Sequence, residues 1–331
     1  MRNKLIILLT LLLYSSTPLL LAQRQLSEDA QISILTCSPG KALYERFGHT
    51  AIRVKDPAAG LDVVFNYGCF SFENEHFYYK FVKGETYYML GVEDARSFFM
   101  TYYAENRFVY EQELNLTFSQ QQELFDKLII NSQPENRTYL YNFVFDNCAT
   151  RPYDLIKEVI GDTIISDYEG YTGQSFRRFI RTYTGAGSWE AFGINMIFGN
   201  RADQAMSSEQ RLFLPEELML YLSQAKTTNG ISVVRSQFIA PFSANAVPWY
   251  KMALFGILFF AAIMIFINIW DWHRNKWSWG VDLALGIVYV LLFAIVIFLT
   301  YFSIHPLVGW NWRLFLFPLI HLCSRLIYIL R

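Results

Sequence analysis

The chain has 331 residues, of which 53% are hydrophobic, and its formal net charge is -1 at pH 7. A chain this long and this apolar is neither one small soluble module nor a disordered protein, so part of it is expected to lie in lipid. The nearly neutral charge provides no basic field for nucleic-acid binding, which excludes that class of function.

Residues 1–22 predict a secretory signal peptide. Two basic residues precede an apolar stretch from Leu5 to Leu21, and the small residue Ala22 ends it. A retained N-terminal helix is the alternative, because Leu20 stands where a small residue usually precedes the cleavage site. Under either interpretation the following domain, residues 23–248, is exported.

A transmembrane domain with two or three helices is predicted over residues 249–331. Met252 to Trp270 and Leu283 to Phe302 are long and apolar enough to cross about 30 Å of hydrocarbon. Leu314 to Leu330 contains a proline, a histidine and an arginine, and we interpret it as a third span. A re-entrant or interfacial segment is the alternative for it.

The loops between these segments predict the orientation. Arg274 and Lys276 follow the first span, whereas the segment from Tyr301 to Asn311 has no lysine or arginine. Because positively charged loops stay in the cytoplasm, residues 23–248 are predicted to lie outside the cytoplasmic membrane. Trp310 and Trp312 would then lie at the outer membrane surface.

The exported segment has the pattern of an α+β domain. Strands are predicted at Ile32 to Thr36, His49 to Val54 and Val63 to Tyr67, the last two forming a hairpin around a turn rich in proline and glycine. Ser119 with Gln122 predicts a capping box at the start of a later helix. Strands and helices therefore alternate irregularly along this part of the chain.

A cysteine opens the most informative predicted helix. Asp146 or Asn147 is suited to cap this helix, Pro152 fits only a first turn, and Gly161 is suited to end it. Cys148 then lies at the helix N-terminus, where the helix dipole and free backbone N–H groups favour a thiolate. The same N–H groups are candidates for holding an oxyanion.

A nucleophilic thiolate needs a base, and the exported domain has two histidines. His49 is the preferred candidate because it begins a predicted strand, which fixes the imidazole, while His76 lies in a polar, loop-like stretch. Asn66, on the paired strand, is the candidate that would orient the imidazole. The alternatives for this third role are Tyr44, Glu45, Tyr67 and Asn147.

Three cysteines of this domain face an oxidising compartment. A Cys37–Cys69 disulfide with Cys148 free is one arrangement, and three free thiols are the other; spacing does not decide between them. A buried, inert cysteine is the ordinary role for a lone Cys148.

Three arginines are candidates for binding a phosphate, because guanidinium groups match phosphate oxygens: Arg53, Arg107 and Arg151. A structural ion pair is the competing role for each, and Arg151 is spaced to pair with Asp154. The chain has no zinc-type ligand pair, phosphate-binding glycine loop or dinucleotide fingerprint, so we expect no metal and no cofactor.

A histidine strand, a hairpin and a later Asn-Cys pair at a helix start resemble the circularly permuted papain-like (NlpC/P60-related) fold. More closely, the chain resembles the Lnb-type lipoprotein N-acyltransferases, which join an exported domain to a transmembrane domain. The similar stretches are residues 48–54, 65–68, 146–151, 173–177 and 214–215, and more loosely 305–306 and 310–312. The family's membrane domain often contains more spans than the two or three predicted here.

The resemblance implies a multi-pass protein of the bacterial inner membrane with a periplasmic catalytic domain. It implies transfer of an acyl chain from a phospholipid to the α-amine of a diacylated lipoprotein, with Cys148 as nucleophile, His49 as base and a thioester intermediate. The alternatives are a peptidoglycan peptidase or amidase, a phospholipase or thioesterase of the same fold, and a non-catalytic module that binds envelope proteins.

Overall fold

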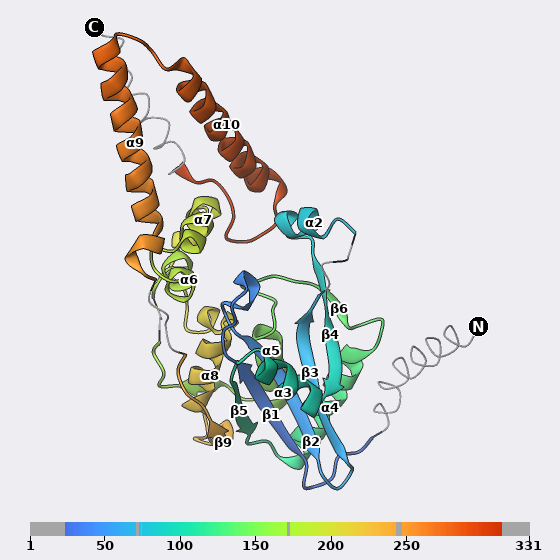
Figure 1. Ribbon diagram of the computed structural model, residues 1–331. Coiled ribbons are helices and arrows are strands. Elements are labelled where there is room, and N and C mark those ends of the chain that lie inside the picture. Colours follow the sequence, from blue (N-terminus) through green and yellow to red (C-terminus); the bar gives the residue numbers. More distant parts are fainter. Residues whose placement is uncertain (1–23, 71–72, 74, 171–172, 243–246, 313–331) are drawn as a thin grey trace, which may run out of the picture. The chain divides into compact units, whose positions relative to one another are not determined.

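A computed structural model describes residues 24–70, 73, 75–170, 173–242 and 247–312 (Figure 1). The predicted signal peptide and the predicted third span, Leu314 to Leu330, lie outside the described residues. The chain divides into two compact units, each built from separate stretches of sequence. Unit 1 comprises Met1–Phe77, Glu85–Thr172 and Ser207–Phe242, and unit 2 comprises Tyr78–Gly84, Gly173–Met206 and Ser243–Arg331.

Unit 1 is built on a seven-stranded antiparallel sheet with the strand order β6-β4-β3-β2-β1-β5-β9. Its strands are β1 (Gln31–Cys37), β2 (His49–Asp56), β3 (Leu61–Cys69), β4 (Tyr87–Asp94), β5 (Val109–Leu114), β6 (Thr138–Leu140) and β9 (Val234–Phe238). A separate two-stranded sheet pairs β7 (Ile164–Ser166) with β8 (Ala225–Thr227).

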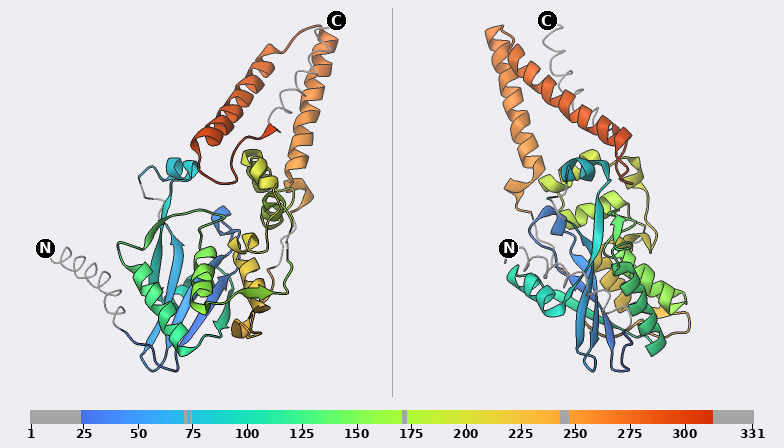
Figure 2. Two further views of the ribbon diagram at one scale, coloured as in Figure 1. Left: turned by 180° about the vertical axis from the view of Figure 1, so that it is seen from behind. Right: turned by 90° about the vertical axis from the view of Figure 1, so that its right-hand side faces the viewer.

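Helices cover both faces of the large sheet (Figure 2). Alternate residues of the central strands face opposite sides, as the period of two in a strand requires. On one side, Ile52 and Phe65 belong to the larger core with residues of α4 (Phe118–Ser132), α5 (Thr150–Ile160) and α8 (Pro215–Ser223). On the other side, Ala51 and Val64 pack with residues of α3 (Ala95–Ala104).

The predicted strands are confirmed as β1, β2 and β3, and the predicted hairpin joins β2 to β3. The capping box of α4 was predicted at the wrong residues. Thr117 is the N-cap and accepts a hydrogen bond from the Gln120 N–H, whose side chain returns to Thr117. The Gln122 amide instead accepts a hydrogen bond from the Leu26 N–H, a long-range contact that competes with a local cap.

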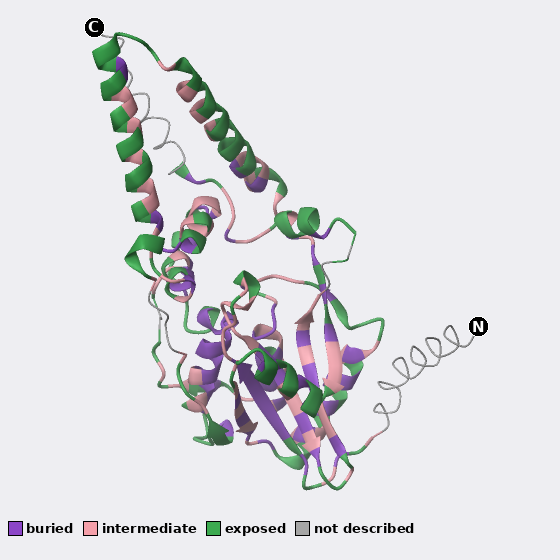
Figure 3. Ribbon diagram, viewed as in Figure 1, coloured by how far each residue is buried: buried purple, intermediate pink, exposed green. Residues whose placement is uncertain are grey.

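Unit 2 contains most of α2 (Phe77–Lys83), together with α6 (Phe176–Thr184), α7 (Trp189–Ile197), α9 (Ala253–Arg274) and α10 (Trp279–Phe302). The two predicted spans are confirmed as helices: α9 and α10 are both long and apolar enough to cross a membrane. Figure 3 shows that most of their surface is exposed. Four short 3-10 helices complete the described elements of the chain: η1 (Leu43–Glu45), η2 (Asn200–Asp203), η3 (Gln210–Phe213) and η4 (Trp249–Lys251).

Candidate active site

His49 is the first residue of β2, and its backbone is fixed on both sides. It pairs with Cys37 of β1 in the sheet register. The preceding residue, Gly48, has a φ of +75°, and a Cβ there would lie 2.6 Å from the Cys37 carbonyl oxygen. Only glycine fits that approach without strain, so this residue allows the strand to begin with the histidine in place.

Cys148 lies in the turn immediately before α5 and is 8% exposed. The N-cap of α5 is Ala149, and not Asp146 or Asn147 as predicted. Asn147 lies two residues earlier, and its Oδ1 accepts hydrogen bonds from the N–H groups of Ala149 (2.8 Å) and Thr150 (3.0 Å). Gly161 ends the helix in the left-handed conformation, as predicted. Because the N–H groups of Ala149 and Thr150 donate to Asn147, they are not the free oxyanion donors that the sequence suggested.

Cys148 and His49 lie side by side although they are 99 positions apart in the chain. A Cβ built on Gly68 of β3 would be 3.5 Å from Cys148 Cβ and 3.8 Å from His49 Cε1. A bulge between Asn66 and Cys69 interrupts the β3–β4 ladder at this point, and Gly68 has a φ of +89°. The bulge and the missing side chain leave room next to both residues.

A chain of hydrogen bonds orients the imidazole of His49. Its Nε2 lies 2.6 Å from Asn66 Oδ1, and Asn66 Nδ2 donates to Glu93 Oε1 at 3.0 Å. A carboxylate only accepts, so Glu93 fixes which end of the Asn66 amide faces the histidine. His49 Nε2 therefore carries a hydrogen and donates a hydrogen bond to Asn66 Oδ1. The other ring nitrogen, Nδ1, is then the one that exchanges a proton with Cys148.

The electrostatics of the pair favour charge separation. Burial acts to raise the pKa of the Cys148 thiol, but the charge and hydrogen bond of His49 and the backbone N–H of Thr50 outweigh it, so the net pKa is lowered. Burial acts to lower the pKa of His49, but Cys148 and then Asn66 outweigh it, so the net pKa is raised. Both directions favour transfer of the thiol proton to the imidazole, the arrangement that a nucleophilic cysteine needs.

Glu93 was missed by sequence analysis. It lies on β4 opposite Val64, and nothing local distinguishes it from other polar strand residues. The other candidates for the third role have different partners. Tyr67 accepts a hydrogen bond from Asn131, Asn147 accepts one from the Ala149 N–H, and Glu45 accepts one from the Ala42 N–H.

Arg53 and Arg107 are both held by acidic neighbours. Arg53 makes a bidentate ion pair with Asp62 at 2.7 Å and a second with Glu111 at 3.2 Å. It is four residues from His49 along β2, which is about 13 Å in an extended strand. Arg107 donates to the Ser38 carbonyl oxygen at 2.8 Å and to Glu105 at 2.9 Å.

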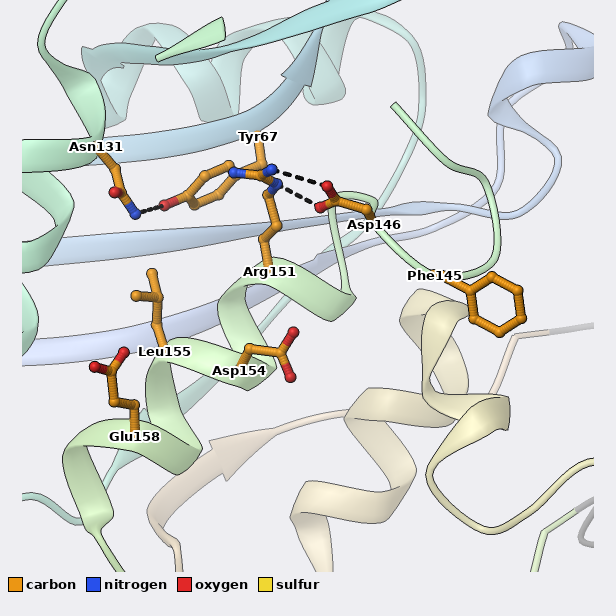
Figure 4. Close-up of a pocket in the computed structure, with 8 residues that line it drawn as sticks. All are labelled: Tyr67, Asn131, Phe145, Asp146, Arg151, Asp154, Leu155 and Glu158. Atoms are coloured by element: carbon orange, nitrogen blue, oxygen red, sulfur yellow. Dashed lines mark hydrogen bonds and ion pairs between the residues drawn. The ribbon is translucent and has the colours of Figure 1, made fainter. Parts of the chain in front are cut away.

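Arg151 borders a pocket of about 390 Å³ (Figure 4). It pairs with Asp146 through two hydrogen bonds of 2.5 and 2.8 Å, not with Asp154 as its helical spacing suggested. Asp146 lies in the turn before α5, and this turn brings it back toward the helix. The rule for side chains three residues apart applies only within a helix, so it could not predict this partner. The pocket is lined by Tyr67, Asn131, Phe145, Asp146, Arg151, Asp154, Leu155 and Glu158, which include three carboxylates.

Cys37, Cys69 and Cys148 are free thiols, so of the two predicted arrangements the structure has the one without a disulfide. His76 is exposed and lies 3.4 Å from Glu75, outside the site. Within the described part of the chain, no three histidine, cysteine, aspartate or glutamate residues are grouped as a metal site would require.

Comparison with known proteins identifies both parts of the chain. The family model of the Lnb N-terminal periplasmic domain matches residues 22–181, and that of the Lnb transmembrane domain matches residues 248–331. Searches of the curated proteins and of the solved structures found no match, so the circularly permuted papain-like fold stays a prediction. The chain belongs to the Lnb family, and its periplasmic and transmembrane domains indicate an inner-membrane protein.

Proposed function

We propose that this chain is a lipoprotein N-acyltransferase that uses Cys148 as nucleophile, His49 as base and Asn66 as orienting residue. Membership of the Lnb family indicates an enzyme of lipoprotein maturation in the membrane. The observation that supports the chemistry is the hydrogen bond between Cys148 and His49, which lowers the pKa of the thiol, with Asn66 bonded to the other ring nitrogen. Together these groups are suited to acyl transfer through a thioester.

In the first half-reaction, the Cys148 thiolate attacks the ester carbonyl carbon of a phospholipid. A carbon–sulfur bond forms, the carbonyl oxygen gains the negative charge, and the intermediate collapses by breaking the ester carbon–oxygen bond. The imidazolium of His49 gives its Nδ1 proton to the departing alkoxide. The products are a lysophospholipid and an acyl thioester on Cys148.

In the second half-reaction, the α-amine of a diacylated lipoprotein attacks the thioester. Neutral His49 accepts a proton from the amine, the carbon–sulfur bond breaks, and an amide and the thiolate–imidazolium pair result. Glu93 acts as a positioning residue, because it keeps Asn66 Oδ1 directed at His49 through the cycle.

The proposal gives no phosphate contact to Arg53 or Arg107, whose guanidinium groups are held by neighbouring residues. Phosphate binding by Arg151 stays a prediction. A phosphate would have to displace Asp146, and the pocket already contains three carboxylates.

The test is mass spectrometry of the N-terminal peptide of a lipoprotein from cells that lack their own N-acylation. We expect a third acyl chain when the intact protein is present and none with Cys148→Ser. Cys37→Ser is the matched control for removal of a buried thiol, and it should retain N-acylation. Diacylated lipoproteins together with released fatty acid would instead identify a phospholipase, and diacylated lipoproteins without fatty acid would contradict acyl chemistry at this site.

A further inference from the structure

Two helices of equal length differ in what covers their apolar side chains. α7 and α8 each have nine residues. In α8, seven of the nine are buried, while in α7 only Ala191 is. The apolar members of α7 are Trp189, Ala191, Phe192, Ile194, Met196 and Ile197, and its only polar side chains are those of Glu190 and Asn195. Among them Trp189 is exposed, and Phe192, Ile194, Met196 and Ile197 are partly buried.

The start of α7 is joined to the start of the first span. The Ala253 N–H, at the first residue of α9, donates to the Gly187 carbonyl oxygen at 2.8 Å. A Cβ on Gly256 would lie 2.5 Å from an atom of the Trp189 ring, so the indole packs on the glycine face of α9. Despite this contact, Trp189 is 51% exposed.

These contacts place the indole relative to the hydrocarbon. From Ala253 to Trp270, before the polar end of α9, the helix rises about 27 Å. This nearly equals the hydrocarbon thickness of about 30 Å, so Ala253 lies at the outer boundary. Gly256 is about 4.5 Å further along the axis. Trp189 is therefore at the depth where interfacial tryptophans lie.

The end of α7 is joined to the segment that follows the second span. The side-chain amide of Asn311 donates to the carbonyl oxygens of Asn195 (3.0 Å) and Met196 (2.9 Å). The Gly199 N–H donates to the Leu307 carbonyl oxygen at 2.9 Å. Helix α10 ends at Phe302, so this segment emerges from the outer end of the span.

We propose that α7 lies in the outer leaflet of the membrane, with its apolar side chains between the phospholipid headgroups and acyl chains. The start of α7 is bonded to the first residue of the first span and its end to the segment that follows the second span, so a bilayer that surrounds α9 and α10 reaches α7 as well. A short helix with tryptophan, phenylalanine and aliphatic residues fits this boundary, where its apolar surface is removed from water. The partner is a phospholipid layer, and the contact is independent of Cys148.

The test is photolabelling of the full-length protein in phosphatidylcholine vesicles. A phosphatidylcholine with a diazirine near the ester end of one acyl chain is activated, and the denatured protein is digested with trypsin. Cleavage gives one peptide for α7 (residues 182–201), one for α8 (residues 212–226) and one for α9 (residues 252–274). The α8 peptide is the matched control, because it is similarly apolar but its helix is buried in unit 1.

We expect label on the α7 and α9 peptides and none on the α8 peptide. Label on α9 alone would overturn the proposal, because the bilayer would then surround the spans without reaching α7. Equal label on α7 and α8 would also overturn it, since the probe would follow apolar composition and not position. None of these outcomes depends on acyltransferase activity, so the result is separable from the proposed function.

Discussion

The surroundings of Cys148 and Cys37 show that burial alone does not decide what a cysteine does. Both thiols are buried, and Cys37 is even the strand partner of His49. Burial raises the pKa of Cys37 far above its ordinary value, and the opposing effects of Tyr102 and Arg107 do not outweigh it. For Cys148 the imidazole and backbone N–H groups outweigh the same effect. One environment therefore disfavours the thiolate and the other favours it.

The largest loss of activity is expected when the Cys148 thiol itself is removed. Cys148→Ala should reduce kcat for N-acylation by about 10⁴-fold or more, because the covalent route is lost. Cys37→Ala should leave kcat nearly unchanged, although the small void left in the core lowers stability. The measurement is the rate of third-chain addition to a diacylated lipopeptide. Comparable losses of kcat in Cys148→Ala and Cys37→Ala would contradict the assignment of Cys148 as the nucleophile.

Removing the imidazole should make Cys148 resemble Cys37. His49→Ala should reduce kcat by about 10²- to 10⁴-fold, because the general base is lost. In this variant the pKa of the Cys148 thiol should rise above its ordinary value, because burial still raises it and His49, the main group that lowers it, is absent. The measurement is the pH dependence of alkylation in the tryptic peptide 138–157, with Cys69, whose pKa is raised to about 11, as internal reference.

The intact enzyme should show a bell-shaped pH profile. Activity rises as pH increases through the lowered pKa of Cys148, when the thiolate forms, and falls as pH increases through the raised pKa of His49, when the imidazolium is lost. Because the two groups titrate together, the apparent pKa values of the two limbs describe the pair and not the single residues. If the alkylation midpoint were unchanged in His49→Ala, the imidazole would have no part in forming the thiolate.

A smaller effect is expected from the hydrogen-bond chain behind His49. Asn66→Ala removes a bond to a charged group, worth about 1.5–3 kcal/mol, and should slow acylation by about 10- to 100-fold. Glu93→Gln should cost less, about threefold to tenfold, because a glutamine still offers one acceptor. Both changes should shift the alkaline limb of the pH profile to lower pH, because the imidazolium loses stabilisation. A loss of rate with an unshifted profile would indicate only a structural role.

The smallest effect concerns the space beside the pair. Gly68→Ala and Gly60→Ala both place a side chain at positive φ, +89° and +59°, and each should lower the free energy of unfolding by about 1–2 kcal/mol. Only the methyl group at Gly68 would contact Cys148 and His49; at Gly60 nothing lies within 4 Å. Denaturation should show a similar loss of stability in both variants. When activity is measured on folded protein, it should fall only in Gly68→Ala.

The sequence predicted the local parts of this site and not the long-range ones. The hairpin that carries His49 and Asn66 follows from the alternation of residues, and the end of α5 at Gly161 follows from the preference of glycine for that position. Glu93 could not be found this way, because its role depends on which strand pairs with β3. The same limit explains Arg151, whose partner depends on how the chain turns before α5.

The membrane region shows the same division. Both described spans follow from composition, since about 20 apolar residues have few other stable environments. The assignment of Tyr78–Gly84 and Gly173–Met206 to the same unit as the spans was not predictable. It rests on backbone contacts such as that of Gly199 with Gly309, where a Cβ would lie 2.8 Å from backbone carbon. Hydropathy does not detect such contacts.

The bonds of α7 to the first span and to the segment after the second span affect how the periplasmic part could be prepared alone. A chain shortened to end at residue 247 would keep α7 and lose the Asn311 amide and the Ala253 N–H that bind its ends. The carbonyl groups of Gly187, Asn195 and Met196 would lose these donors, and the Trp189 ring would lose its glycine surface. Such a fragment would carry an unsupported apolar helix and a tendency to aggregate. A soluble version requires replacement of the apolar side chains of α7 by polar ones, and not only a stop codon before the first span.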